Sequence, residues 1–297
     1  MILENKTSAA YIFNKVKYDL LIVFLVGLIT NVLTVKFNHL LPEMPLSIPA
    51  LLGTAISILL SFKMNQSYDR WWEARKVWGA IVNDSRTFII QLQTMLPFDE
   101  KEAIKRLAYR QIAWCYALGN SLRGLTPMEG SEHLIPDAEL PEILQHTNKP
   151  LAIVQQNAKE LKEFRSQNKL ETFTLLQLDN TLVRLVDSMG KAERINTTVF
   201  PSTYRQFLHY AVYLFVITLS ISLKQVNMIF EIPLLLAIAS AFFLIEKSAY
   251  HLQNPFRNRP SDIPVTAIAR TIEINIRQLL GEKQVPEPIK PQGFYIL

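Results

Sequence analysis

Histidine and cysteine are the residues of this chain that could first be considered for metal or nucleophilic chemistry. The five histidines stand at positions 39, 133, 146, 209 and 251, and no two of them have metal-ligand spacing. The single cysteine, Cys115, lies among Trp114, Tyr116 and Leu118, and this apolar setting favours a buried structural thiol over a nucleophile. The sequence contains no phosphate-binding loop and no nucleophile elbow. It therefore predicts no enzyme activity, no metal site and no cofactor.

A dense run of charged and aromatic residues, YDRWWEARKVWG, occupies positions 68–79 and follows an apolar stretch at 46–62. Such a junction is typical of a helix that leaves the membrane hydrocarbon and enters a basic, aromatic-rich aqueous surface. We expect the tryptophans to pack an aqueous domain against the membrane interface, and the charged residues to form ion pairs that fix the helix to that domain. The residues concerned are Trp71, Trp72 and Trp78, and Asp69, Arg70, Glu73 and Arg75.

Three further apolar stretches, at 20–35, 207–223 and 228–245, have the composition of membrane spans. Short loops join the first span to the second and the third to the fourth, so we predict two transmembrane hairpins. Hydrophobic residues make up 49% of the chain and the mean hydropathy is +0.14. These values fit a membrane part combined with a sizeable aqueous part. Glu231 and His209 lie at span ends, where solvation costs little, and we assign neither a functional role.

The aqueous part is predicted at 63–203, where charges are dense and helical stripes replace continuous apolarity. A proline-rich connector occupies 126–150. After it, apolar residues three and four positions apart predict one buried helix face that ends near Gly190. These residues are Leu175, Leu178, Leu182, Leu185 and Met189. The fold class is therefore all-α, with four transmembrane helices and a helical aqueous domain without strands.

Lysine and arginine are distributed unevenly around the predicted spans. The two short loops hold only Lys36 and Lys224. By the positive-inside rule, both termini and the aqueous domain lie in the cytoplasm, with the spans in the inner (plasma) membrane. The net charge of +5 is then assigned to the membrane flanks and not to nucleic-acid binding. The basic residues on the other side of the spans are Lys6, Lys15, Lys17, Lys63, Arg70, Arg75, Lys76, Arg205, Lys247, Arg257 and Arg259.

Four segments follow from this reading of the chain. Residues 1–62 form the N-terminal segment and the first hairpin, and 63–203 form the cytosolic helical domain. Residues 204–247 form the second hairpin, and 248–297 form a cytosolic tail. The tail contains an amphipathic helix and ends in a proline-rich strip.

The run at 68–79, directly after an apolar helix, resembles the bestrophin family in its prokaryotic branch. Three other elements carry the same resemblance: GTAISILLSF at 53–62, NPF and DIP within 254–264, and AIARTIEINIRQLLGE at 267–282. The order of hairpin, long helical insert, hairpin and tail extends the resemblance over nearly the whole chain.

The resemblance implies an ion channel: a homopentamer in the lipid bilayer with one central pore for monovalent ions, by family default chloride and other anions. It implies that Thr54, Ile58 and Phe62 line a hydrophobic neck, and that Phe173 forms a cytosolic aperture. Periodicity alone does not choose this face of the second span, because its other faces are equally apolar. Without the resemblance, Phe173 could equally be an aromatic packed locally at a helix start. A cation-selective channel of the same architecture and a non-conducting membrane scaffold are the alternatives.

The segment after the fourth span departs from the animal members of the family, which carry an acidic run there that helps to bind calcium. Here the segment reads HLQNPFRNRPSD, with Arg257 and Arg259 and no acidic residue before Asp262. Calcium binding requires several oxygen ligands, preferably carboxylates. We therefore expect that opening does not depend on calcium.

Overall fold

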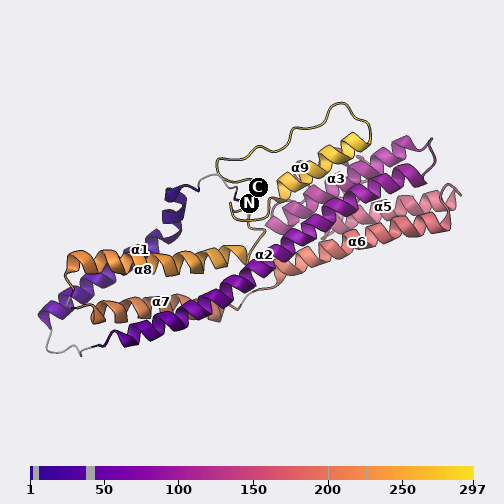
Figure 1. The fold of residues 1–297 in the computed structure, drawn as a ribbon. Coiled ribbons are helices and arrows are strands. Elements are labelled where there is room, and N and C mark those ends of the chain that lie inside the picture. Colours follow the sequence, from indigo (N-terminus) through magenta and orange to yellow (C-terminus); the bar gives the residue numbers. More distant parts are fainter. Residues whose placement is uncertain (3–6, 38–43, 200, 225) are drawn as a thin grey trace. The chain divides into compact units, whose positions relative to one another are not determined.

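The computed structural model describes residues 1–2, 7–37, 44–199, 201–224 and 226–297. These described residues are all-α, as the sequence predicts, and their only extended pairings are isolated bridges of Tyr295 with Ile2 and Gln292. Part of the predicted loop at 36–45, including His39, lies outside the described residues. The helices are α1 (Ala9–Lys36), α2 (Ser47–Met95), α3 (Lys101–Arg123), the 3-10 helix η1 (Glu132–Leu134), α4 (Leu140–Gln145), α5 (Lys149–Ser166), α6 (Thr172–Thr197), α7 (Ser202–Ser222), α8 (Met228–Leu252) and α9 (Val265–Leu279) (Figure 1).

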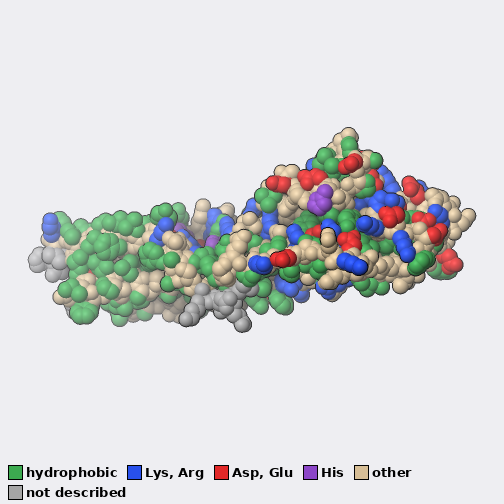
Figure 2. Space-filling view, turned by 90° about the horizontal axis from the view of Figure 1, so that it is seen from above, with side chains coloured by type: hydrophobic (Ala, Val, Ile, Leu, Met, Phe, Trp, Pro, Cys, Tyr) green, Lys and Arg blue, Asp and Glu red, His purple; other side chains and the backbone are tan. Residues whose placement is uncertain are grey.

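The chain forms two compact units that interleave along the sequence. The first, which we call the apolar unit, comprises residues 4–70 and 199–253. The second, which we call the charged unit, comprises residues 1–3, 71–198 and 254–297. Hydrophobic side chains cover most of the visible face of the apolar unit, whereas acidic and basic side chains gather over the charged unit (Figure 2).

The apolar unit is a bundle of α1, the first part of α2, α7 and α8. Its core contains fully buried residues from several of these helices, such as Val23, Leu208 and Phe243. A Cβ atom at Gly53 would lie only 3.0 Å from the ring of Phe215, so α2 and α7 approach each other closely there. Small residues allow such close approach between membrane helices.

Among the described helices, three are long and apolar enough to cross a membrane: α1, α2 and α8. The predicted third span corresponds to α7, which is not one of the three. Polar residues lower the apolarity of this helix, and some of them have partners inside the same unit. The Thr218 hydroxyl donates to the Leu214 carbonyl oxygen at 3.0 Å, and the Tyr213 hydroxyl donates to Asp19 at 3.0 Å.

The charged unit is built around α3, which packs against α5, α6 and α9. Its core contains Trp78 and Trp114, both with 0% of their surface exposed. Four members of the predicted α6 stripe are buried, with Leu178 at 0% exposure, and Leu175 is partly buried. The predicted end of this helix near Gly190 is wrong, because Ala192 and Ile195 extend the buried face and α6 continues to Thr197. A helical glycine costs only about 1 kcal/mol relative to alanine, which this packing offsets.

Two of the predicted segment boundaries fall inside continuous helices. Glu246 and Lys247 do not close the helix of the fourth span, because α8 continues to Leu252. Both side chains are held by partners inside the apolar unit, so their charges do not require the helix to end. Residue 62 also marks no break in secondary structure, since α2 is a single helix of 49 residues.

Candidate functional site

The part of α2 that lies in the apolar unit has two different faces. Ile56 and Leu60 are buried, with 3% and 2% of their surface exposed, and belong to the core of the unit. Ile58 and Phe62 are 53% and 60% exposed. Thr54 is also exposed, and its hydroxyl donates to the Ala50 carbonyl oxygen at 2.9 Å. The three predicted neck residues therefore share an apolar face that the rest of the unit does not cover.

Directly after this segment, a buried ionic network joins the four helices of the apolar unit. The Lys63 ammonium has no exposed surface and binds Glu246 of α8 at 3.3 Å. His209 of α7 lies between two carboxylates, with Nδ1 3.3 Å from Glu246 and Nε2 3.6 Å from Asp19 of α1. Two further side chains bind Asp19: Lys247 and Tyr213. Sequence reasoning missed this network, although each predicted span has one of these charged or polar residues near the same end.

Glu231 is buried and not solvated, contrary to the expectation for a span end. Only 1% of its surface is exposed. Its carboxylate accepts hydrogen bonds from Ser220 Oγ at 2.7 Å and from Asn31 Nδ2 at 3.4 Å. Because both donors are side chains of neighbouring helices, the carboxylate is stabilised without water.

The tryptophan run lies mainly within the charged unit. Trp78 is fully buried, whereas Trp72 is 47% exposed. The Trp71 ring stacks on Trp72 with centroids 6.4 Å apart, and its Nε1 donates to the Ser261 carbonyl oxygen at 3.2 Å. This bond ties α2 to the turn that precedes α9.

None of the charged members of the run is as buried as Trp78. Asp69 is exposed, and Arg70, Glu73 and Arg75 are half-buried. Glu73 pairs with Lys76 at 2.6 Å. This pair joins successive turns of α2, so it supports the helix itself and does not connect it to another element.

The segment 254–264 forms a tight turn around Asp262. The Asp262 carboxylate is buried and accepts hydrogen bonds from the backbone N–H groups of Arg257 at 2.7 Å and Arg259 at 3.0 Å. Burial raises its pKa above the usual value for an aspartate. Within the described part of the chain, no three histidine, cysteine or acidic side chains are grouped as metal ligands.

Two other predicted residues of the charged unit differ sharply in exposure. Phe173, in the first turn of α6, is 82% exposed and is not packed within its own unit. Cys115 has no exposed surface, and its Sγ lies 3.7 Å from Ser85 Oγ. Burial raises the pKa of this thiol to about 12, as expected for a structural cysteine.

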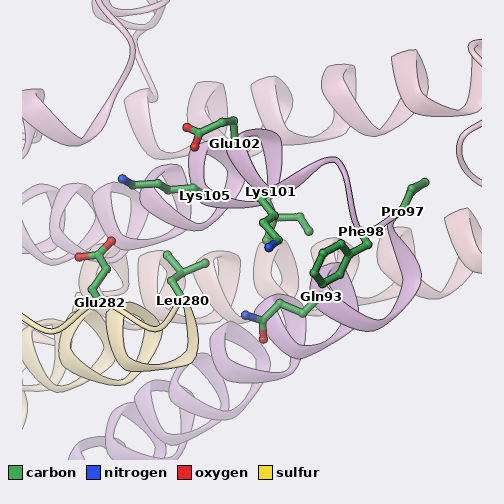
Figure 3. Close-up of a pocket in the computed structure, with 9 residues that line it drawn as sticks. Gln93, Pro97, Phe98, Lys101, Glu102, Lys105, Leu280 and Glu282 are labelled. Atoms are coloured by element: carbon green, nitrogen blue, oxygen red, sulfur yellow. The ribbon is translucent and has the colours of Figure 1, made fainter.

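The charged unit also contains a cavity of about 430 Å³ at the ends of α2 and α9 and the start of α3. Phe98, Lys101 and Gln93 converge at one side of it (Figure 3). The Lys101 ammonium lies 4.0 Å from the centroid of the Phe98 ring. None of the predicted site residues lines this cavity.

Comparison with known proteins gives consistent matches along the chain. A family model described as Bacterial/Fungal Bestrophin protein matches residues 6–278. The voltage-dependent anion channel-forming protein YneE of Escherichia coli (strain K12) is 29% identical over 287 residues, which cover 96% of this chain and 93% of that protein. The voltage-dependent anion channel-forming protein RSc3414 of Ralstonia nicotianae is 26% identical over 282 residues, which cover 93% of this chain and 91% of that protein.

Solved structures give the same result. The crystal structure of a bacterial bestrophin homologue from Klebsiella pneumoniae has a TM-score of 0.85 at 29% sequence identity. The similarity covers 91% of this chain and 100% of that chain. The motifs at 53–62, 68–79 and 254–264 all lie inside the region that the family model matches. The chain therefore belongs to the bacterial/fungal bestrophin family, a family of ion channels and not of enzymes.

Proposed function

We propose that this chain is the subunit of a homopentameric, anion-selective channel of the inner (plasma) membrane. The observation that carries the proposal is the similarity over 96% of the chain to a protein named as a voltage-dependent anion channel-forming protein. The uncovered apolar face of α2 supports it, because a helix face that its own unit leaves bare is suited to line a pore or to meet another copy.

The neck of this pore is formed by Thr54, Ile58 and Phe62 from each copy. Rings of Ile58 and Phe62 offer an ion no replacement for its hydration shell, so the neck gates by dewetting. The Thr54 hydroxyl makes its ring easier to wet than the other two. At the cytosolic exit, the exposed Phe173 side chains form a second constriction.

Four spans cross the membrane: α1, the first part of α2, α7 and α8. The 21 residues of α7 give a length of about 30 Å at about 1.5 Å per residue, which matches the hydrocarbon thickness. Several of its polar side chains, including Tyr213 and Thr218, bind partners inside the apolar unit and so need no water within the bilayer. Both termini lie in the cytoplasm. The segments 63–203 and 248–297 serve as cytosolic domain and tail.

Opening of the channel does not require calcium. The Asp262 carboxylate already accepts two backbone hydrogen bonds, and no described acidic cluster accompanies it. A calcium site needs several oxygen ligands that are free to coordinate the ion.

The decisive experiment measures ion flux through the purified protein in liposomes under a potassium chloride gradient, with protein-free liposomes as the control. The expected reversal potential lies near the chloride equilibrium potential. Reversal near the potassium equilibrium potential would contradict anion selectivity and support the cation-selective alternative. An absence of current from correctly assembled protein would support the non-conducting scaffold.

A further inference from the structure

A cavity of about 700 Å³ opens on the apolar unit, and none of the proposed neck residues lines it. Its walls come from the first turns of α1 and α7 and from the last turns of α8. Each of these helices contributes a basic side chain: Lys15, Arg205 and Lys247. The cavity thus combines basic groups from three helices at one end of the bundle.

The charge balance of this cavity favours an anion. Among the described residues that line it, Glu246 is the only acidic one, and Lys63 already binds that carboxylate at 3.3 Å. Lys247 is paired with Asp19. Arg205 forms no ion pair with any carboxylate in the described part of the chain, and its guanidinium lies over the Tyr250 ring at 5.0 Å. A guanidinium on a ring face keeps N–H donors at its edge, so Arg205 retains hydrogen bonds to offer.

Tyrosines accompany the basic groups around the cavity: Tyr11, Tyr210 and Tyr250. The Lys15 ammonium lies 4.7 Å from the centroid of the Tyr11 ring. Tyrosine is enriched where membrane proteins meet lipid headgroups, because its ring is apolar and its hydroxyl is polar. The residues that line the cavity are therefore of the types found at the lipid-headgroup region of membrane proteins.

An exposed apolar stripe starts at this cavity and continues along α7. Tyr210, Leu214 and Ile217 are 67%, 52% and 39% exposed, and their spacing of four and three residues places them on one helix face. A basic cavity that continues into an apolar stripe is complementary to a phospholipid, since the cavity suits the phosphate headgroup and the stripe suits an acyl chain. A soluble phosphate would use only the cavity.

We infer that this cavity binds the phosphate headgroup of an anionic phospholipid, with an acyl chain along the exposed face of α7. Arg205 donates to the phosphate, Lys15 adds positive charge at the cavity wall, and the tyrosines frame the headgroup. Lipid binding is a property additional to the proposed ion conduction. Its test depends neither on ion selectivity nor on the orientation of the chain in the membrane. Failure of one proposal therefore leaves the other open to its own test.

The test is native mass spectrometry of the detergent-purified assembly, titrated with phosphatidylglycerol or with phosphatidylcholine of the same acyl chains. Phosphatidylglycerol is expected to bind more tightly. Arg205→Gln is expected to weaken its binding about five-fold, the usual contribution of one basic residue near a membrane surface. Arg205→Lys keeps the charge and is expected to bind within about two-fold of the unchanged protein. The measured mass of the assembly reports whether each variant is intact.

The matched control is Lys224→Gln, which removes one positive charge just after the other end of α7. It is expected to leave phosphatidylglycerol binding unchanged. An equal loss in Lys224→Gln and Arg205→Gln would overturn the inference, because the effect would then be general surface charge. Equal binding of the two lipids would also overturn it. Displacement of the lipid by an equal concentration of glycerol phosphate would assign the cavity to soluble phosphates instead.

Discussion

At the scale of single residues, α2 separates apolar side chains that are chemically alike. Ile56 is 3% exposed and Ile58 is 53% exposed, although they are two positions apart. Truncation of Ile56 removes packing from the core of the unit. Truncation of Ile58 removes only side-chain atoms that are largely exposed within the subunit. Function and stability are therefore expected to respond to different isoleucines.

Ile58→Ala and Phe62→Ala are expected to increase current, because each removes apolar width from the neck and makes it easier to wet. Ile56→Ala is the matched control and is expected to lower the free energy of unfolding by about 2–5 kcal/mol. Single-channel recording and thermal unfolding of the assembled protein measure the two effects. If Ile56→Ala raised the current while the two neck variants left it unchanged, the pore-facing side of α2 would have been assigned wrongly.

Phe173→Ala is expected to increase conductance or admit larger anions with little change in stability, because the side chain is 82% exposed within the subunit. Leu178→Ala, on the buried stripe of the same helix, is expected to cost about 2–5 kcal/mol. Gel filtration, thermal unfolding and single-channel recording separate the two outcomes. Disassembly of the Phe173 variant with unchanged conductance of the remaining channels would identify a packing residue instead.

At the scale of elements, the turn at 254–264 is held by hydrogen bonds to its own backbone. Phe256 and Ile263 are buried, and Asp262 accepts hydrogen bonds from two main-chain N–H groups. A turn that satisfies its carboxylate internally has little to gain from a cation.

Currents are accordingly expected to be the same in a calcium chelator and in micromolar calcium. The measurement is a macroscopic current from one patch exposed to both solutions in turn. Asp262→Asn serves as the control for this turn, since it keeps an acceptor oxygen for the backbone while removing the charge. Steep, reversible activation by calcium would mean that ligands come from elsewhere in the assembly.

Element types could be predicted from the sequence because periodicity reports burial directly. The α6 stripe is an example, since the spacing of Leu178, Leu182 and Leu185 matches one helix face. Helix ends could not be predicted as well. Gly190 has the residue type of a helix stop, but the packing of Ala192 and Ile195 decides otherwise.

For the candidate site too, some features could be predicted from the sequence and others could not. The second span is visible in the sequence, but its faces are not, because Ile56 and Ile58 are equally apolar; their unequal burial needs the fold. The pair of Lys63 and Glu246 joins residues that are 183 positions apart, which no local pattern reports. The pore-facing role of Thr54, Ile58 and Phe62 came from the family resemblance and stays a prediction.

At the scale of the whole molecule, the buried thiol changes how orientation can be measured. Cys115 has 0% exposure, and burial raises its pKa to about 12. At neutral pH the thiol is therefore protonated and inaccessible, whichever side of the membrane the charged unit faces. Its failure to react with an impermeant reagent would therefore say nothing about topology. It also means that the native cysteine can stay in place while others are introduced.

Introduced cysteines at two exposed positions report the orientation. Val226→Cys, between α7 and α8, is expected to react with an impermeant maleimide in intact cells. Lys290→Cys, with a side chain that is 84% exposed in the unmodified protein, is expected to react only after the membrane is permeabilised. Labelling of Lys290→Cys in sealed cells would reverse the proposed topology.

The interleaving of the two units has a consequence for synthesis on the ribosome. Residues 71–198 emerge early, but Phe256, Ile272 and Ile276, which complete the core of the charged unit, emerge only after residues 199–253. At about 5–20 residues per second, the nascent helices wait several seconds with an apolar face uncovered. Apolar surface that stays exposed in this way favours chaperone binding and aggregation. The α7–α8 hairpin must therefore be translated before the charged unit can close, and a chain that stalls within it leaves both units unfinished.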